Sequence, residues 1–125
     1  MKKLHRAVQQ GLLAACHDCS DGGLAVALSE MVIGGTWGLD IFLENTWSED
    51  GSVETLLFSE TPGRFVVEVH EECCGAFERL MKNESCFRLG VVIPEPVLKI
   101  RNGQVSLCEI PHKALEEAWK GAVTW

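Results

Sequence analysis

The sequence predicts an α+β fold, with a mixed β-sheet and helices packed mainly on one face of the sheet. Helical apolar patterns are interspersed with short β-branched runs, in the order α-α-β-(α)-β-α-β-β-β-α. The dipeptide Asn102-Gly103 between two alternating runs is typical of a tight hairpin. A length of 125 residues with 46% hydrophobic and 23% charged residues fits a single domain over residues 1–125.

The predicted helices rest on apolar residues that recur every three or four positions. Gly34 and Gly35 end the second of these helices in the manner of a C-cap, and Pro111 precedes the last. Periodicity does not decide whether the short stretch 53–58 is helical. The predicted helices cover about residues 3–16, 24–32, 73–81 and 114–122.

The predicted strands are rich in β-branched residues and bounded by turn residues. A two-residue turn at Asn102-Gly103 pairs Ile100 with Val105 and Leu98 with Leu107 on the core side of the hairpin. The opposite side of the hairpin is then polar. The predicted strands cover residues 39–43, 64–69 and 87–93, followed by the two hairpin strands.

Charge and hydropathy narrow the classes of partner. The net charge is −7, and no basic cluster interrupts the chain, so nucleic-acid binding is not expected. The basic start, residues 1–6, resembles a signal sequence only superficially, because residues 9–11 break the apolar stretch that a signal sequence needs. No apolar run approaches membrane length. We therefore expect a soluble, cytoplasmic protein without a membrane partner.

Six cysteines allow two interpretations. Cys16 and Cys19 have the C-x2-C spacing of zinc ligands, which His70 and Cys73 could complete. The other interpretation treats all six as small hydrophobic residues, because most lie in apolar helical or strand-like runs. We favour the second interpretation and predict no metal site in this chain.

Residues 17–24 form an acidic, glycine-rich turn that leads directly into a helix. Gly22 and Gly23 allow close approach of another backbone or a phosphate, and the first helical N–H groups lack partners within the helix. These features predict an anion site. The alternative is a structural turn in which Ser20 or Asp21 caps the helix. His17, just before the turn, is a partner of the helix dipole at a C-terminus, a packed polar residue or a general base.

Two longer segments, residues 17–31 and 57–69, closely resemble the phosphoribosylformylglycinamidine synthase family, within the aminoimidazole ribonucleotide synthetase superfamily. The resemblance is to the C-terminal domain of this superfamily and covers nearly the whole chain. The synthase carries this unit twice, and the chain resembles the second copy (subunit II). The resemblance implies an ATP-dependent amidation in purine biosynthesis that converts formylglycinamide ribonucleotide to the amidine with ammonia from glutamine.

The resemblance also implies cofactors and partners. ATP and Mg²⁺ serve the full enzyme, and none is expected to bind tightly to the isolated domain. The metal-binding acidic residues and a catalytic histidine are expected in an N-terminal partner domain absent from this chain, so the domain alone should be inactive. Further expected partners are the other superfamily unit, a glutaminase subunit or domain, nucleotide and a ribonucleotide phosphate.

The site residues implied for this chain are Ser20, Asp21, Gly22 and Gly23 for phosphate or nucleotide, with Glu60 and Arg64 as possible ligand contacts. Asp21 would either cap the helix or orient magnesium. Glu60 and Arg64 would otherwise form an ion pair across the Pro62-Gly63 turn. The first copy of the family unit has Ser-Glu-Ser-Gln-Glu-Arg where residues 59–64 stand here, so this segment lacks the glutamine and the second glutamate.

Two other functions stay open at this point. The domain could come from an aminoimidazole ribonucleotide synthetase, a selenophosphate synthetase or a thiamine-monophosphate kinase, although residues 20–23 and 58–60 argue against that. It could also be a non-catalytic interaction module, with Trp37, Trp47 and the loop 45–52 forming the partner surface.

Overall fold

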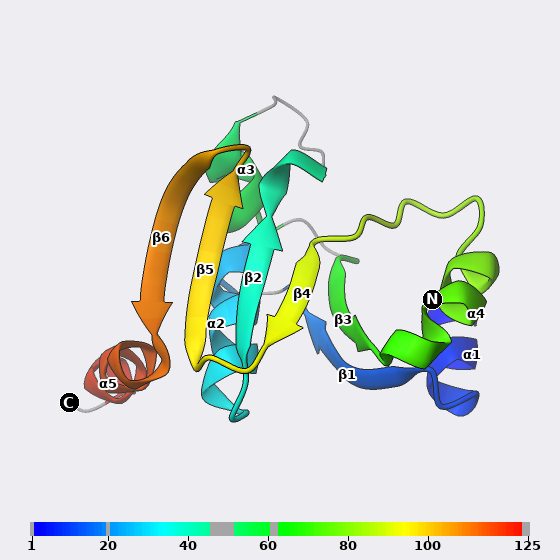
Figure 1. Ribbon diagram of the computed structural model, residues 1–125, viewed down its shortest axis with the longest axis horizontal. Coiled ribbons are helices and arrows are strands. Elements are labelled where there is room, and N and C mark those ends of the chain that lie inside the picture. The colour runs from blue at the N-terminus through cyan, green and yellow to red at the C-terminus, as the bar shows by residue number, and fades with distance from the viewer. Residues whose placement is uncertain (1, 20, 46–51, 61–62, 124–125) are drawn as a thin grey trace.

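The computed structural model describes residues 2–19, 21–45, 52–60 and 63–123. Short 3-10 turns at residues 43–45 and 71–73 connect some of the longer elements. The helices and strands of the described residues, drawn in Figure 1, are α1 (Lys2–Gln9), β1 (Leu13–Asp18), α2 (Gly23–Ile33), β2 (Gly38–Phe42), α3 (Val53–Phe58), β3 (Phe65–Val69), α4 (Cys74–Leu80), β4 (Gly90–Ile93), β5 (Val97–Asn102), β6 (Val105–Pro111) and α5 (His112–Val123).

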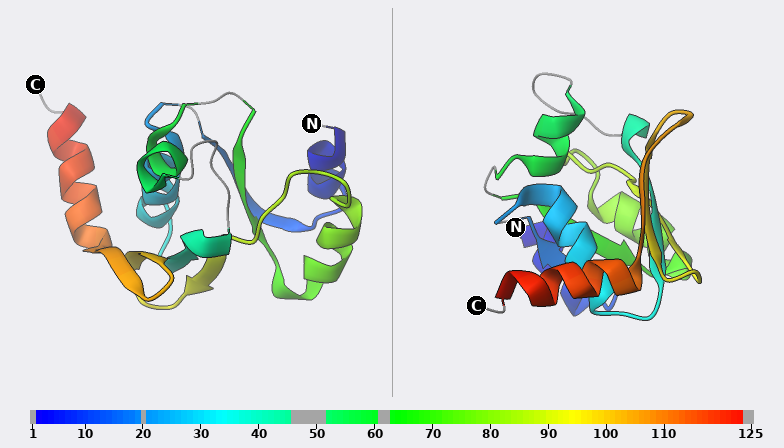
Figure 2. Two further views of the ribbon diagram at one scale, coloured as in Figure 1. Left: turned by 90° about the horizontal axis from the view of Figure 1, so that it is seen from above. Right: turned by 90° about the vertical axis from the view of Figure 1, so that its left-hand side faces the viewer.

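Four strands form a mixed sheet in the order β4-β2-β5-β6, as the predicted fold class requires. Strand β2 runs parallel to β5, and the other two pairings are antiparallel. Helix α2 packs against β2 and β5 and also contacts α3 and α5. Figure 2 shows these helices on the same side of the sheet. Among the described residues, no helix covers the other face of this sheet.

Strands β1 and β3 form a separate antiparallel pair. This pair curves away from the larger sheet toward α1 and α4, which lie side by side at that end of the molecule (Figure 1). A small core of Ala7, Leu12 and Phe77 joins the two helices to the pair. The larger core lies between α2 and the four-stranded sheet, where Leu28, Val32 and Leu98 are almost completely buried.

The prediction of a first helix that continues to residue 16 is wrong. Helix α1 ends at Gln9, and Gly11 has a φ of +67°, a left-handed conformation that turns the chain out of the helix. The chain then forms β1, whose residues alternate between half-buried and exposed. Ala15 fits the helical spacing from Leu12, but it also fits the two-residue alternation of the strand, whose half-buried positions are Leu13, Ala15 and His17.

The predicted hairpin exists, but its register is different. Asn102 pairs with Val105, so the two turn residues are Gly103 and Gln104. Gly103 takes a left-handed φ, +62°, which fits a turn with glycine at its first central position.

A bulge beyond Arg101 then shifts the remaining pairs of the hairpin. Ile100 therefore lies opposite Cys108, and Leu98 lies opposite Ile110. Val105 and Leu107, which the simple register places toward the core, are 62% and 42% exposed on the edge strand. The extra residue in β6 moves the apolar alternation of this strand out of step with that of β5.

The remaining predicted elements are found with small changes of boundary. The stretch that periodicity left open, Val53–Phe58, is a helix in which Ser52 accepts a hydrogen bond from the Thr55 N–H at 3.1 Å. The strand expected from residue 87 begins only at Gly90. Helix α2 ends at Ile33, and its C-cap residue Gly34 has a right-handed conformation instead of the left-handed one common at this position.

Candidate functional site

The glycine loop joins the end of β1 to the start of α2. Gly22 and Gly23 have φ values of +83° and +71°, which side chains disfavour. A Cβ on Gly23 would lie 2.7 Å from the Ser59 carbonyl oxygen and 2.9 Å from that of Leu57. The loop therefore packs backbone against backbone at the C-terminal end of α3, and only glycine allows this approach.

The helix cap differs from the prediction. Gly22 is the N-cap residue of α2, and no side chain of its own can cap the helix. Asp21 is exposed and precedes the cap, and Ser20 lies outside the described residues. The expected cap by Asp21 is wrong because the left-handed backbone at this position selects glycine over an aspartate.

The carboxylate of Glu60 contacts the loop from the second sequence motif. Its Oε1 atom accepts a hydrogen bond from the Gly22 N–H at 3.0 Å. The residues predicted from two distant motifs therefore do lie together. A negatively charged oxygen stands at the start of α2, where the helix dipole favours an anion.

Arg64 does not pair with Glu60 among the ion pairs of the described residues. Its guanidinium instead donates to the carbonyl oxygens of Ser59, at 3.1 Å, and Leu56, at 3.0 Å. Both carbonyls lie at the C-terminal end of α3, where a cation is favourable. The Arg64 carbonyl also accepts from the Cys19 N–H at 2.9 Å. Arg64 thus holds the α3 end beside the glycine loop.

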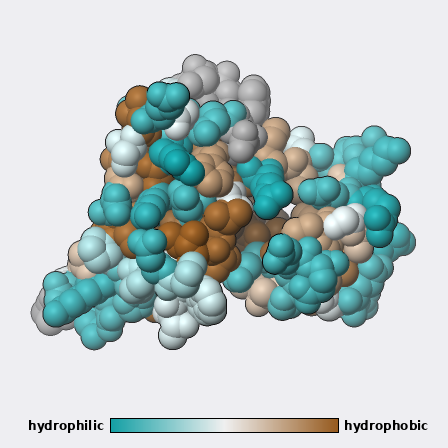
Figure 3. All heavy atoms as spheres, in the orientation of Figure 1, coloured by the Kyte–Doolittle hydropathy of each residue, from teal (hydrophilic) through white to brown (hydrophobic). Residues whose placement is uncertain are grey.

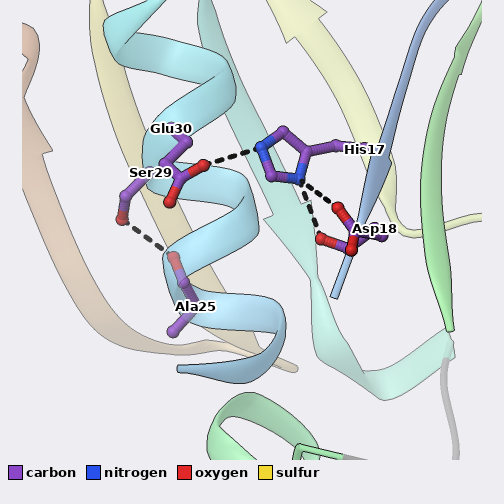
Figure 4. A network of polar contacts seen from close by, with 5 residues as sticks. All are labelled: His17, Asp18, Ala25, Ser29 and Glu30. Carbon is purple, nitrogen blue, oxygen red and sulfur yellow. Dashed lines mark hydrogen bonds and ion pairs between the residues drawn. The ribbon is translucent and has the colours of Figure 1, made fainter. Parts of the chain in front are cut away.

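His17 makes a contact that the sequence did not predict. Figure 4 shows its ring between Glu30 on α2 and the backbone of Asp18. The Nε2 atom lies 2.8 Å from Glu30 Oε2, and the Nδ1 atom lies 2.8 Å from the Asp18 carbonyl oxygen. The only sequence signal for this pair is that residue 17 belongs to a strand next to α2, which the helical interpretation of residues 3–16 concealed.

The surroundings of His17 raise its pKa above the ordinary value. The hydrogen bond to the Asp18 carbonyl contributes most, partial burial opposes it, and the hydrogen bond and charge of Glu30 add to the increase. The pKa of the Cys16 thiol, and that of Cys19, is raised as well, mainly by desolvation. These two cysteines therefore stay in the thiol form around neutral pH.

Metal-ligating groups do not gather in the part of the chain that the structure describes. There, no three His, Cys, Asp or Glu side chains are arranged to hold a metal ion. All six cysteines are free, with Cys19 buried and Cys16 exposed. No described helix combines the length and apolar character that crossing a membrane requires.

An apolar surface lies near the opposite end of α2. Trp37 is 57% exposed, and Val91 and Val92 on β4 are 39% exposed each. Val92 pairs with the core residue Leu39 and so lies on the α2 side of the sheet, whereas Val91 pairs with Asp40 on the uncovered side. Figure 3 views the uncovered side and shows hydrophobic residues gathered over β2 and β4. Trp47 and Trp125 lie outside the described residues. A shallow pocket of about 90 Å³ opens beside Trp37, lined by Met31, Gly35, Trp37, Gly38, Leu39, Glu68 and Val92.

These features define a class of α+β domain in which a glycine-rich loop leads from a two-stranded sheet into the helix that covers a mixed four-stranded sheet. The sequence matches the family described as AIR synthase related protein, C-terminal domain, over residues 1–102. The chain belongs to this family.

One curated relative is the phosphoribosylformylglycinamidine synthase subunit PurL of Lactobacillus helveticus (strain DPC 4571), which is 39% identical over 123 residues. The alignment covers 98% of this chain and 16% of the relative, so the chain spans about a sixth of that protein. Structures of Thermotoga maritima PurL, including one complexed with ATP and one of PurLQS, share the fold with a TM-score of 0.79. They are 23% identical and align to 91% of this chain and 20% of theirs.

Proposed function

We propose that this chain acts as the C-terminal domain of a PurL-type phosphoribosylformylglycinamidine synthase. The observation that carries the proposal is the 39% identity to the Lactobacillus helveticus subunit across almost the whole chain. The reaction would be the ATP-dependent conversion of formylglycinamide ribonucleotide to formylglycinamidine ribonucleotide, with nitrogen from glutamine. It would need the parts that make up the remaining length of the relatives, and the domain alone would be inactive.

The contribution of this domain would be one wall of a phosphate or nucleotide site. The start of α2 offers N–H groups without partners in the helix, although Gly23 packs closely against the carbonyl oxygens at the end of α3. The Glu60 carboxylate already occupies the Gly22 N–H, which supports a preference of this position for negative charge. A phosphate would displace Glu60 from this N–H, and Ser20 and Asp21 stay predicted as further phosphate contacts.

Arg64 and magnesium would have separate roles. The guanidinium of Arg64 donates to two carbonyls at the end of α3. We therefore assign Arg64 the role of holding the α3 end against the glycine loop, and we assign it no contact with the ligand. Magnesium, when bound with ATP, would neutralise phosphate charge. The described residues do not converge on a cation. The metal ligands would therefore come from other parts of the enzyme.

The exposed apolar residues on both sides of β4, which are Trp37 and Val92 at the pocket and Val91 on the uncovered face, would face the rest of the synthase. Single exposed hydrophobic residues are common on proteins, whereas gathered ones are typical of an interface, and here they gather on the uncovered face of the sheet. Trp37 and Val92 also lie together at the pocket. The expected partners are the N-terminal domain, the other superfamily unit and a glutaminase. The solved PurLQS structure of the Thermotoga maritima relative supports an assembly of this kind.

The test is a titration of the chain with Mg-ATP, ADP and ribose 5-phosphate, followed by NMR at the Gly22 and Gly23 amides. Shifts centred on these two amides support the phosphate site. Shifts confined to other residues, or none with any of the three ligands, contradict a phosphate site formed by these amides.

Variants sharpen this test. Glu60→Gln removes the competing charge and should strengthen ATP binding about 2- to 5-fold, since such a charge at a helix start contributes roughly 0.3–1 kcal/mol. Glu54→Gln, an exposed carboxylate on α3, is the matched control and should change nothing. Weaker binding in Glu60→Gln would instead make Glu60 a ligand contact.

Gly22→Val, whose side chain would overlap Val26, should abolish binding.

A further inference from the structure

We propose that His17, as an imidazolium, is a positioning residue that ties the end of β1 to α2 and thereby fixes the Gly22 and Gly23 amides. The structural part of this proposal concerns the loop alone. Its consequence for ligand affinity rests on the function proposed above.

The ring geometry indicates the charged form. Nε2 faces a Glu30 carboxylate oxygen and Nδ1 faces the Asp18 carbonyl oxygen, both at 2.8 Å. Both partners are acceptors. A neutral imidazole carries one N–H and can satisfy only one of them, whereas an imidazolium donates to both. The two short distances together therefore select the protonated ring.

The location of the contact connects it to the loop. His17 is on the strand that enters the loop, and Glu30 is on α2 about two turns beyond its start. Between them, the Cys19 N–H donates to the Arg64 carbonyl, and the Gly22 N–H donates to Glu60. The His17 contact joins β1 directly to the body of α2.

The charges around His17 all favour its protonation. On α2 it faces Glu30, and on its own strand Asp18 Oδ1 lies 4.0 Å from Nδ1. On β3, Val66 lies opposite His17, and the carboxylate-bearing Glu68 lies opposite Ala15, the next residue on that face. The hydrogen bond to the Asp18 carbonyl is the largest cause of the raised pKa of His17, and the hydrogen bond to Glu30 and the charges of Glu30 and Asp18 add to it.

The proposal gives the loop a pH dependence. Because the pKa is raised in the folded chain, the imidazolium contact is complete below the ordinary histidine pKa of 6.5 and is lost as the pH rises through the raised value. Above that value only one of the two hydrogen bonds remains. The tie between β1 and α2 then weakens, and the glycine amides gain freedom.

The experiment follows the chain without ligand by NMR from pH 5.5 to pH 9. We expect the Gly22 and Gly23 amides to shift with the same midpoint as the His17 ring protons. We also expect amide hydrogen exchange at Cys19 and Gly22, corrected for intrinsic rate, to become about tenfold faster above the midpoint. If His17 titrates while both glycine amides stay constant, the proposal is wrong.

Three variants separate positioning from general stability. His17→Gln should remove the glycine transition, while His5→Gln, an exposed histidine on α1, should leave it intact. Glu30→Gln keeps an acceptor without charge and should lower the His17 midpoint, because the hydrogen bond and the charge of Glu30 both raise the pKa of His17. An unchanged midpoint in Glu30→Gln contradicts the contact. If His17→Gln fails to fold, the shared or separate midpoints of His17 and the glycine amides in the unmodified chain decide whether the proposal holds.

A final comparison measures Mg-ATP affinity on both sides of the midpoint. Weaker binding above it, in the unmodified chain but not in a folded His17→Gln variant, extends the role of His17 to the ligand. Equal affinity on both sides overturns that extension. Absence of ATP binding at either pH contradicts the proposed function. The ligand-free amide titration still tests the positioning role of His17 in that case.

Discussion

Two glycine turns in this chain share a backbone conformation and differ in their surroundings. Gly23 and Gly103 have φ values of +71° and +62°. A Cβ on Gly103 would meet nothing within 4 Å, whereas one on Gly23 would press on the α3 backbone. Gly103 is therefore required by the conformation of one turn. Gly23 is required by the packing of two segments that are distant in the sequence.

The largest effect in this comparison is expected for Gly23→Ala. The substitution adds backbone strain and places a methyl group 2.7 Å from the Ser59 carbonyl oxygen. Together these should lower the free energy of unfolding by about 2–4 kcal/mol. Urea denaturation followed by circular dichroism measures this loss. A loss below about 1 kcal/mol would show that the α3 end moves aside easily.

A smaller effect is expected for Gly103→Ala. The space around this residue is open, so only the left-handed conformation is penalised. The free energy of unfolding should fall by about 1 kcal/mol in the same denaturation experiment. A loss equal to that of Gly23→Ala would remove the distinction between the two turns.

The smallest effect is expected for Asn102→Val. Asn102 is the last residue of β5, pairs with Val105 and has no left-handed φ. Valine suits a strand, so the stability should change by no more than about 0.5 kcal/mol. A larger loss, by thermal unfolding, would indicate that Asn102 and not Gly103 takes the critical turn position.

The sequence predicted the elements with strong periodicity and missed those that rest on backbone geometry. Helix α2, strand β3 and the hydrophobic core around Leu28 follow apolar patterns in the sequence. Strand β1 was missed because its alanines fit either a helix or a strand, and the left-handed turn at Gly11 decides between the two. In the hairpin, one bulge reversed which residues of β6 face the core.

The candidate site was predictable to a similar degree. The family resemblance named residues of both motifs as candidate ligand contacts, and the hydrogen bond from the Gly22 N–H to Glu60 brings the two motifs together. The pairing of His17 with Glu30 was not predictable, because it depends on the missed strand. The role of Arg64 was also hidden, because backbone carbonyls carry no signature in side-chain patterns.

The two hydrogen bonds from Arg64 to the α3 carbonyls and the His17 contact hold the glycine loop from different sides. A guanidinium keeps its charge throughout the pH range in which proteins fold, whereas an imidazole does not. The side of the loop that rests on α3 is therefore a permanent anchor, and the side held through His17 is a conditional one. Alkaline conditions would therefore loosen the loop on its His17 side, while Arg64 still holds the side that rests on α3.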